Sequence, residues 1–126
     1  MKIPDGHQAI MPYLIVKNAN GFIEFTKEVF NAAVTQKMFR GDETVIMHAE
    51  IIINNCTIMF CDATDQWAQV TASLFAYVDN ADETFHKAKA AGGTVLMELS
   101  DQPYGRTCGI TDPTGNTWWI TSVEQV

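Results

Sequence analysis

The sequence predicts an α+β domain built from two tandem modules, each with the element order βαβββ. Three observations predict this fold: an internal repeat, an amphipathic helix early in each half, and strand patterns joined by tight turns. The chain has 126 residues, of which 47% are hydrophobic, enough for the core of one domain. We therefore expect a single domain over 1–126, with module one at about 8–62, a bridge at 63–72 and module two at about 73–126.

The repeat appears when the segment from Tyr13 is aligned without a gap to the segment from Phe75. Both segments read as an apolar strand, an Asn-Ala turn, an amphipathic helix and a second apolar strand. Because a repeated sequence pattern indicates a repeated supersecondary unit, the two halves are expected to fold alike. The identical pairs are Val16 with Val78, Asn18 with Asn80, Ala19 with Ala81, and Lys27 with Lys89.

The first module begins with the alternating segment MPYLIVK, which predicts a strand. The following residues place Phe22, Phe25 and Val29 on one face of a helix. Three strands are then expected, in VTQKMFR, IMHAEIII and TIMFCDA. Asn54-Asn55 joins the last two of them and suits a two-residue hairpin turn.

The second module repeats this order, starting with the strand SLFAYVD. Asn80 with Glu83 resembles a capping box at the start of its helix, and Gly92-Gly93 suits the end of that helix. Strands follow in TVLMEL, roughly TCGIT, and NTWWITS. Residues 112–115 read Asp-Pro-Thr-Gly, which favours a type I turn before the last strand.

Composition excludes some classes of function. The net charge of −7 argues against nucleic-acid binding, which needs clustered basic residues. Since no apolar run approaches the length of a membrane span and the N-terminus is too polar for a signal peptide, we expect a cytoplasmic protein. Cys56, Cys61 and Cys108 lack zinc-ribbon spacing and are expected to be buried, reduced thiols.

Two βαβββ modules in one short chain resemble the vicinal-oxygen-chelate superfamily, which includes glyoxalase I, bleomycin-resistance proteins, extradiol dioxygenases and fosfomycin-resistance enzymes. More narrowly, MPYLIVKNANGFIEFTKEVFNA, MHAEIIINNCTIMFCD and YGRTCGITDPTGNTWWIT look like its PhnB-like branch. The chain departs from that pattern at Asn31, where relatives usually carry glycine at a helix C-cap. The resemblance implies a mixed sheet curved around a cleft.

The resemblance also implies where a metal would bind. Catalytic members of the superfamily hold a divalent metal with four side chains, usually His, Glu or Gln, from the first and last strands of each module. In this sequence the corresponding positions are Met11, Phe60, Ser73 and Trp119. A thioether suits only soft metals, and neither aromatic ring offers a lone pair. We therefore expect neither a metal nor another cofactor.

Strand alternation predicts an aromatic, nearly uncharged lining for the cleft. Trp119 is expected to face the cleft, with Trp118 in the core beneath the second helix. Arg106 would either clamp an anionic ligand at the cleft mouth or pair with a surface carboxylate. The residues expected to bind a ligand are Met11, Tyr13, Phe60, Ser73, Phe75, Tyr77, Tyr104, Arg106 and Trp119.

His48 and Glu50 lie on one side of a predicted strand and are the candidates for catalysis. They could form a base with its orienting carboxylate, a pair of metal ligands, or a hydrogen-bonded structural pair. A two-residue turn puts them on the sheet face opposite to that of Phe60, and therefore away from the cleft if Phe60 faces it. His7 and His86 look exposed and are assigned no role.

Three functions remain open at this point. The first is a metal-free, homodimeric protein that binds an apolar or aromatic small molecule, as bleomycin-resistance proteins hold their drug. The second is a lyase, isomerase or dioxygenase of the glyoxalase class, with a relocated metal or a metal-free acid–base site. The third is an interaction domain whose aromatic face forms a dimer interface.

Overall fold

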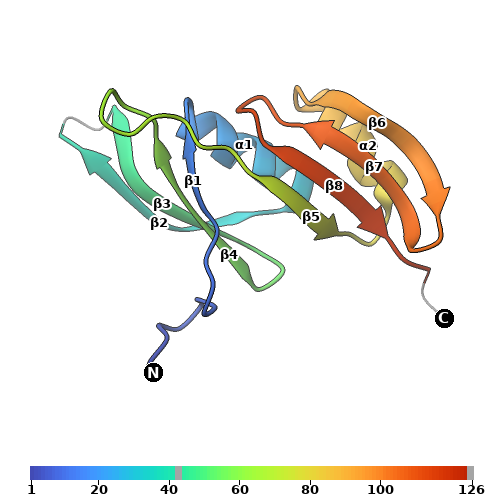
Figure 1. Cartoon of the computed structure of the whole chain (residues 1–126), viewed down its shortest axis with the longest axis horizontal. Helices are drawn as coiled ribbons and strands as arrows, with labels where there is room; N and C mark the ends of the chain where they lie inside the picture. The colour runs from blue at the N-terminus through green and yellow to red at the C-terminus, as the bar shows by residue number, and fades with distance from the viewer. Residues whose placement is uncertain (42–43, 125–126) are drawn as a thin grey trace.

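The computed structural model describes residues 1–41 and 44–124, which form two helices and eight strands (Figure 1). The first module contains β1 (Tyr13–Val16), α1 (Ala19–Phe30), β2 (Ala33–Arg40), β3 (Val45–Ile53) and β4 (Cys56–Asp62). The second contains β5 (Ser73–Tyr77), α2 (Ala81–Ala90), β6 (Thr94–Gln102), β7 (Gly105–Thr111) and β8 (Thr117–Ser122). Both modules therefore have the predicted order βαβββ.

Each module forms its own four-stranded mixed sheet. The strand orders are β1-β4-β3-β2 and β5-β8-β7-β6. In each sheet the first strand of the module pairs in parallel with the last, and the other pairs are antiparallel. The identical topology of the two halves confirms the repeat. Neither helix is long and apolar enough to cross a membrane, as far as the described residues go.

Both helices lie on the same side of the sheets, behind them in Figure 1. The predicted face of α1 is buried, with Phe22 fully inaccessible and its ring centroid 4.8 Å from that of Phe60. Trp118 of β8 is also buried, and its ring centroid lies 4.5 Å from that of Phe30 at the end of α1. The two modules therefore share one hydrophobic core between their helices and their sheets.

The turns form where the sequence predicts them. Asn54 and Asn55 have φ angles of 45° and 66°, the left-handed values that a type I′ hairpin needs at both positions. This turn aligns Ala49 with Phe60 and sets the β3–β4 register. Asn31 ends α1 with a φ of 56°, which confirms that asparagine occupies the left-handed cap.

The turn before β8 is organised by Asp112, which is 3% exposed. Its carbonyl accepts a hydrogen bond from the Gly115 N–H at 3.0 Å, as in a type I turn. Its carboxylate accepts from the backbone N–H of Thr114 at 2.9 Å and of Asn116 at 3.0 Å. It also accepts from the indole Nε1 of Trp118 at 2.8 Å. One buried carboxylate thus connects the turn to the core.

The predicted orientation of Phe60 is wrong. Phe60 is fully buried and packs against α1 instead of facing a cleft. The parallel pairing of β1 with β4 explains this, because it aligns Phe60 with the buried Leu14 and Met59 with Tyr13. The side of β4 away from the helices therefore carries Met59 and Cys61.

The cysteines agree with expectation in two of three positions. Cys61 and Cys108 are buried, whereas Cys56 at the start of β4 is exposed. Burial raises the pKa of the Cys108 thiol to about 11, so this side chain is a neutral part of the core. Cys56 is exposed because it immediately follows the Asn54-Asn55 turn.

Candidate functional site

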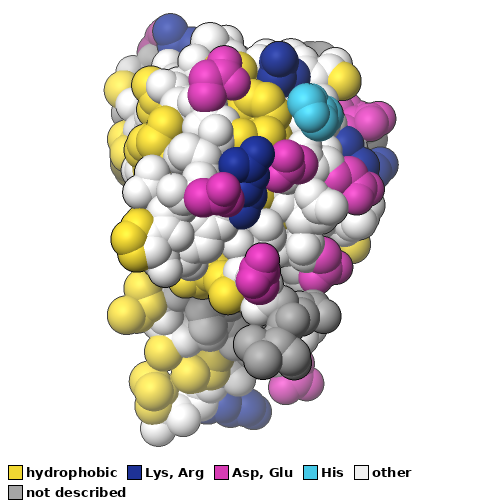
Figure 2. Space-filling view, turned by 90° about the vertical axis from the view of Figure 1, so that its right-hand side faces the viewer, with side chains coloured by type: hydrophobic (Ala, Val, Ile, Leu, Met, Phe, Trp, Pro, Cys, Tyr) yellow, Lys and Arg dark blue, Asp and Glu magenta, His cyan; other side chains and the backbone are white. Residues whose placement is uncertain are grey.

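The side of the two sheets away from the helices is called here the open face. Alternation along the strands brings Tyr13, Phe75, Tyr77 and Trp119 to it, because Leu14 and Trp118 next to them point into the core. Tyr13 is 48%, Phe75 51% and Tyr77 66% exposed. Seen from the end of the second module, hydrophobic side chains gather along the left edge, and acidic and basic ones cover the middle and right (Figure 2).

The aromatic side chains of module two contact one another. The ring centroid of Phe75 lies 5.3 Å from that of Tyr77 and 6.2 Å from that of Tyr104. The indole Nε1 of Trp119 donates a hydrogen bond to the Ser73 hydroxyl at 3.0 Å. Three of the nine predicted ligand-binding residues, Phe75, Tyr77 and Tyr104, are thus in contact through their rings, and Ser73 and Trp119 form a separate pair.

The Trp119 ring lies over a residue that the sequence analysis did not single out. Gly109 on β7 is its partner across the strand pair. A Cβ atom at Gly109 would lie 2.6 Å from Cζ3 of the indole, closer than real contacts allow. The close approach of the Trp119 ring therefore requires glycine at this position. In the sequence, the only indication of this was a glycine in the strand expected to pair with that of Trp119.

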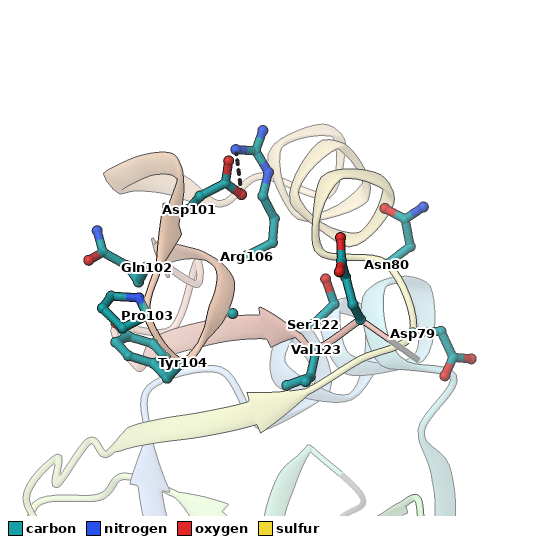
Figure 3. A pocket seen from close by; sticks show the side chains of 11 residues that line it. Asp79, Asn80, Asp101, Gln102, Pro103, Tyr104, Arg106, Ser122 and Val123 are labelled. Atoms are coloured by element: carbon teal, nitrogen blue, oxygen red, sulfur yellow. Dashed lines mark hydrogen bonds and ion pairs between the residues drawn. The ribbon is translucent and has the colours of Figure 1, made fainter. Parts of the chain in front are cut away.

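The predicted residues do not line a single cleft. Tyr13 borders one hollow of about 370 Å³, together with Ile15, Met47, Cys61 and Trp67, among others. Phe75 and Tyr77 border another of about 400 Å³ between the modules. Tyr104 and Arg106 border a third of about 670 Å³ (Figure 3). The expected continuous cleft is thus divided into separate hollows within one copy of the chain.

Arg106 pairs with carboxylates at the surface. Its Nε donates to Oδ1 of Asp82 at 2.9 Å, and its Nη2 donates to Oδ2 of the same residue at 3.2 Å. Its Nη1 donates to Oδ1 of Asp101 at 3.5 Å. Figure 3 shows the side chain extending toward α2 and away from Tyr104. The hydrogen bond from Arg106 lowers the pKa of the Asp82 carboxyl. Of the two interpretations of Arg106, the structure shows the surface ion pair.

Met11 lies at the base of the N-terminal segment and is half-buried. Its sulfur accepts a hydrogen bond from the backbone N–H of Gln8 at 3.4 Å. The Gln8 side chain in turn donates to the Thr57 carbonyl at 2.8 Å and accepts from the Thr57 N–H at 3.3 Å. The threonine hydroxyl donates to the carbonyl of Gly6. The segment before β1 is therefore hydrogen-bonded to β4 through Thr57.

His48 and Glu50 lie on the open face, contrary to expectation, because Phe60 faces the helices. His48 Nε2 is 2.7 Å from Glu50 Oε2, and His48 Nδ1 is 3.2 Å from the Tyr13 hydroxyl. His7 Nε2 lies 2.6 Å from Glu50 Oε1. Tyr13, His48, Glu50 and His7 thus form a continuous row of hydrogen-bonded side chains. His7 was expected to be an exposed residue without a role, and no local pattern connects it with Glu50.

The four side chains of this row differ in burial, and the fold shifts the pKa values of Glu50 and Tyr13. Glu50 is only 4% exposed at its side chain, against 22% for His48 and 18% for His7. Burial alone raises the pKa of the Glu50 carboxyl, but hydrogen bonds from His48 and His7 outweigh it and hold that pKa below its usual value. Burial, with Cys61 and Glu50 nearby, raises the pKa of the Tyr13 phenol.

The four positions that correspond to the superfamily's metal ligands do not fit a divalent metal. Phe60 lies in the core, and the Ser73 hydroxyl receives the indole N–H of Trp119. Met11 offers a thioether, which suits soft metals. No group of three or more His, Cys, Asp or Glu side chains is placed to hold a metal among the residues that the structure describes.

Comparisons with known proteins agree with this fold. The family model for the glyoxalase/bleomycin resistance protein/dioxygenase superfamily matches residues 6–120. An uncharacterized protein of Mycobacterium tuberculosis is 29% identical over 122 residues, which cover 87% of this chain and 71% of that protein.

Two solved structures show the same architecture. The PhnB protein from Bacillus cereus superposes with a TM-score of 0.70 at 19% identity, covering 92% of this chain and 100% of that one. TnmS3, an antibiotic binding protein from Streptomyces sp. CB03234, superposes with a TM-score of 0.71 at 16% identity, covering 94% of this chain and 100% of that one. With two βαβββ modules and a family match along most of its length, the chain belongs to the glyoxalase/bleomycin resistance protein/dioxygenase superfamily.

Proposed function

We propose that this protein binds an apolar or aromatic small molecule on its open face, without a metal ion. The observation that carries the proposal is the exposure of Tyr13, Phe75 and Tyr77 on one side of the sheets. Single exposed apolar residues are ordinary, but a set of them on one concave or open surface is typical of a binding site. Flat aromatic rings also offer large contact areas at a low cost in side-chain entropy.

The dimensions of the hollows support a ligand of moderate size. The two hollows that border Tyr13 and Phe75 have volumes of about 370 and 400 Å³. Both lie within the lower part of the range found for small-molecule pockets, roughly 300–1,000 Å³. The walls of the second are formed mainly by apolar residues, among them Ile53, Ile58 and Leu74. An uncharged, aromatic ligand matches such walls best.

A homodimer is part of the proposal. The hollows of a single copy are separate and open, and a second copy packed on the open face would close them and bury the exposed rings. Burying apolar surface contributes about 25 cal/mol per Å², which favours association through such a face. For ligand binding itself, an antibiotic binding protein among the structural neighbours is a precedent in this fold.

The experiment is a fluorescence titration of the purified protein with an anilinonaphthalene dye, an apolar aromatic probe. Saturable binding is expected, with a stoichiometry that matches the oligomer seen by sedimentation. Phe75→Ala should weaken binding at least tenfold, whereas Val34→Ala, an exposed apolar residue on β2, should leave it unchanged. The metal content of the protein is measured in parallel.

Three results would contradict the proposal. The first is dye binding that Phe75→Ala and Val34→Ala affect equally. The second is a stoichiometric divalent ion whose removal abolishes binding. The third is a stable dimer that excludes the dye altogether, which would favour the open face as a protein interface only.

A further inference from the structure

The row of hydrogen bonds from His7 to Tyr13 has chemical properties that binding of an apolar ligand does not need. We propose that Tyr13, His48, Glu50 and His7 form a proton relay that makes the Tyr13 hydroxyl an acid–base group on the open face. The relay would act on a small apolar molecule that carries an acidic C–H or O–H bond. This goes beyond the proposed function, because a ligand could bind to the open face whether or not it exchanges a proton.

The hydrogen-bond partners determine which nitrogen of each imidazole carries its proton. An ionised carboxylate only accepts hydrogen bonds, so both histidines donate to Glu50 through Nε2–H. In the neutral His48 ring, Nδ1 is therefore unprotonated and is an acceptor. The Tyr13 hydroxyl, 3.2 Å away, donates to it. All the donors in the row thus point from the open face toward Glu50.

The charge balance of the row makes it receptive to one further proton. Glu50 is nearly fully buried, and both side chains that contact its carboxylate in the row are imidazoles, which carry a positive charge only when protonated. A buried charge without a counter-charge is costly, and protonation of His48 at Nδ1 would supply one. Glu50 therefore has the position of the carboxylate that orients a catalytic imidazole and stabilises its charged form.

Other charged or titratable groups near His48 are few. Tyr13 contacts it from β1, Glu50 from its own strand, and Cys61 stands beside Tyr13 on β4. Arg40 on β2 acts on Cys61 and borders the same hollow. The pKa of Cys61 is raised by burial, so its thiol stays neutral. Among these groups, Glu50 is the one that carries a formal charge and is hydrogen-bonded directly to His48.

A substrate can reach the outer end of this row. Tyr13 is half-exposed and borders the hollow of about 370 Å³ whose other walls include Ile15, Met47 and Trp67. These three walls are apolar, which strengthens the electrostatic effect of a nearby proton transfer, while Arg40 also borders the hollow and would attract the anion that the transfer leaves on the substrate. The phenol keeps its proton, since burial raises the pKa of Tyr13. Tyr13 therefore passes a proton on and does not store a negative charge.

The step balances without a metal or a redox partner. The bond from the substrate carbon or oxygen to hydrogen breaks, and its proton forms a new bond to the Tyr13 oxygen. The original Tyr13 proton moves to Nδ1 of His48, and the electron pair stays on the substrate anion. Tyr13 is the catalytic residue, because it touches the substrate. Glu50 and His7 are positioning residues that act through His48.

The test uses a nitro-substituted benzisoxazole, an apolar aromatic probe that reports a general base directly. Loss of its ring C–H proton breaks the N–O bond and forms a nitrile and a coloured nitrophenolate. Wild-type protein should turn it over about a hundredfold faster than Tyr13→Phe or His48→Gln, the low end for a positioned general base. Because the residues act as a unit, the double variant should be no slower than either single one. His86→Gln removes an exposed imidazole on α2 and should have no effect.

The pH profile distinguishes positioning from a structural role. Glu50→Gln and His7→Gln should change the pH dependence of turnover as well as its rate, because each removes a hydrogen bond that orients the row. Nitrogen NMR should show the Nε2–H tautomer for His48. Circular dichroism verifies that each variant is folded.

Two results would overturn the relay. One is turnover by the wild type no faster than by His48→Gln, whether or not the probe binds. The other is an Nδ1–H tautomer for neutral His48. Probe binding with no turnover would leave the proposed ligand site standing, while turnover that persists without saturable dye binding would count against that site alone.

Discussion

The two adjacent tryptophans of β8 donate their indole N–H groups to opposite sides of the sheet. Trp118 donates to the buried carboxylate of Asp112 at 2.8 Å, and Trp119 donates to the Ser73 hydroxyl on the open face at 3.0 Å. One tryptophan is therefore part of the core and the other of the surface that we propose binds a ligand. The first hydrogen bond bears on stability, and the second on the shape of the site.

Replacing Asp112 by alanine should lower the free energy of unfolding by about 3 kcal/mol. The change leaves the Trp118 indole and the backbone N–H groups of Thr114 and Asn116 without their acceptor in a buried place. Urea unfolding followed by tryptophan fluorescence measures this. Asp65→Ala, in the exposed bridge, is the control and should change stability by less than about 0.5 kcal/mol. Equal effects of the two substitutions would contradict the assignment.

Gly109→Ala should displace the Trp119 ring, because the added methyl group would lie 2.6 Å from the indole. Overpacking of this kind costs about 2 kcal/mol, and dye binding to the open face should weaken as well. Trp119→Leu removes the part of the ring that clashes. In that background Gly109→Ala should cost much less, and a cost as large as in the wild type would show that the indole is not the cause. Calorimetric unfolding of the four proteins gives the comparison.

Asn31→Ala should destabilise the protein by about 1 kcal/mol, because the left-handed conformation at the end of α1 is sterically strained for alanine. Asn31→Gly should be neutral or slightly stabilising, because glycine adopts a φ of 56° without strain. Thermal unfolding of the three proteins tests the order Gly, Asn, Ala. An alanine variant as stable as the glycine variant would disprove it.

Stability should fall on acidification through the titration of Glu50. The folded protein holds the pKa of this carboxyl below its usual value of 4.5, so Glu50 contributes stability above that pH. The contribution is lost as pH falls through the lower, folded-state pKa. Urea unfolding at a series of pH values should show this slope, and Glu50→Gln should reduce it. An unchanged slope in the variant would assign the effect to other carboxyls.

Much of the fold could be predicted because its signals are local. The Asn54-Asn55 turn and the Asp112–Gly115 turn each depend on the backbone preferences of a few adjacent residues, and both form as the sequence indicates. The face of α1 was equally clear, since Phe22, Phe25 and Val29 recur at helical spacing.

The face of β4 was not predictable from alternation. Ile58 and Phe60 on one side, and Met59 and Cys61 on the other, are all apolar, so the pattern does not say which side is buried. The pairing with Leu14 on β1 decides it, and this pairing lies outside the local sequence. The wrong choice for Phe60 also turned His48 and Glu50 away from the open face.

The contacts of His7 and Arg106 could not be predicted from the sequence for a related reason. His7 meets Glu50 across 43 positions of sequence, through a segment that has no regular structure. Arg106 had two chemically reasonable partners, and only the position of α2 selects Asp82. Long-range side-chain pairs of this kind follow from the assembled fold and have no signature in any one stretch of residues.

The separation of the two sheets has a mechanical consequence. No strand of the described residues pairs across the modules, so packing between α1, α2 and Trp118 holds them together, with the bridge between them. Packed side chains can slide by small amounts, whereas a hydrogen-bonded ladder can only break. The hollow between the modules, bordered by Ile58 and Phe75, can therefore change its width without the loss of a single sheet hydrogen bond. For the ligand site that we propose, such sliding would let one set of residues fit flat molecules of different thickness.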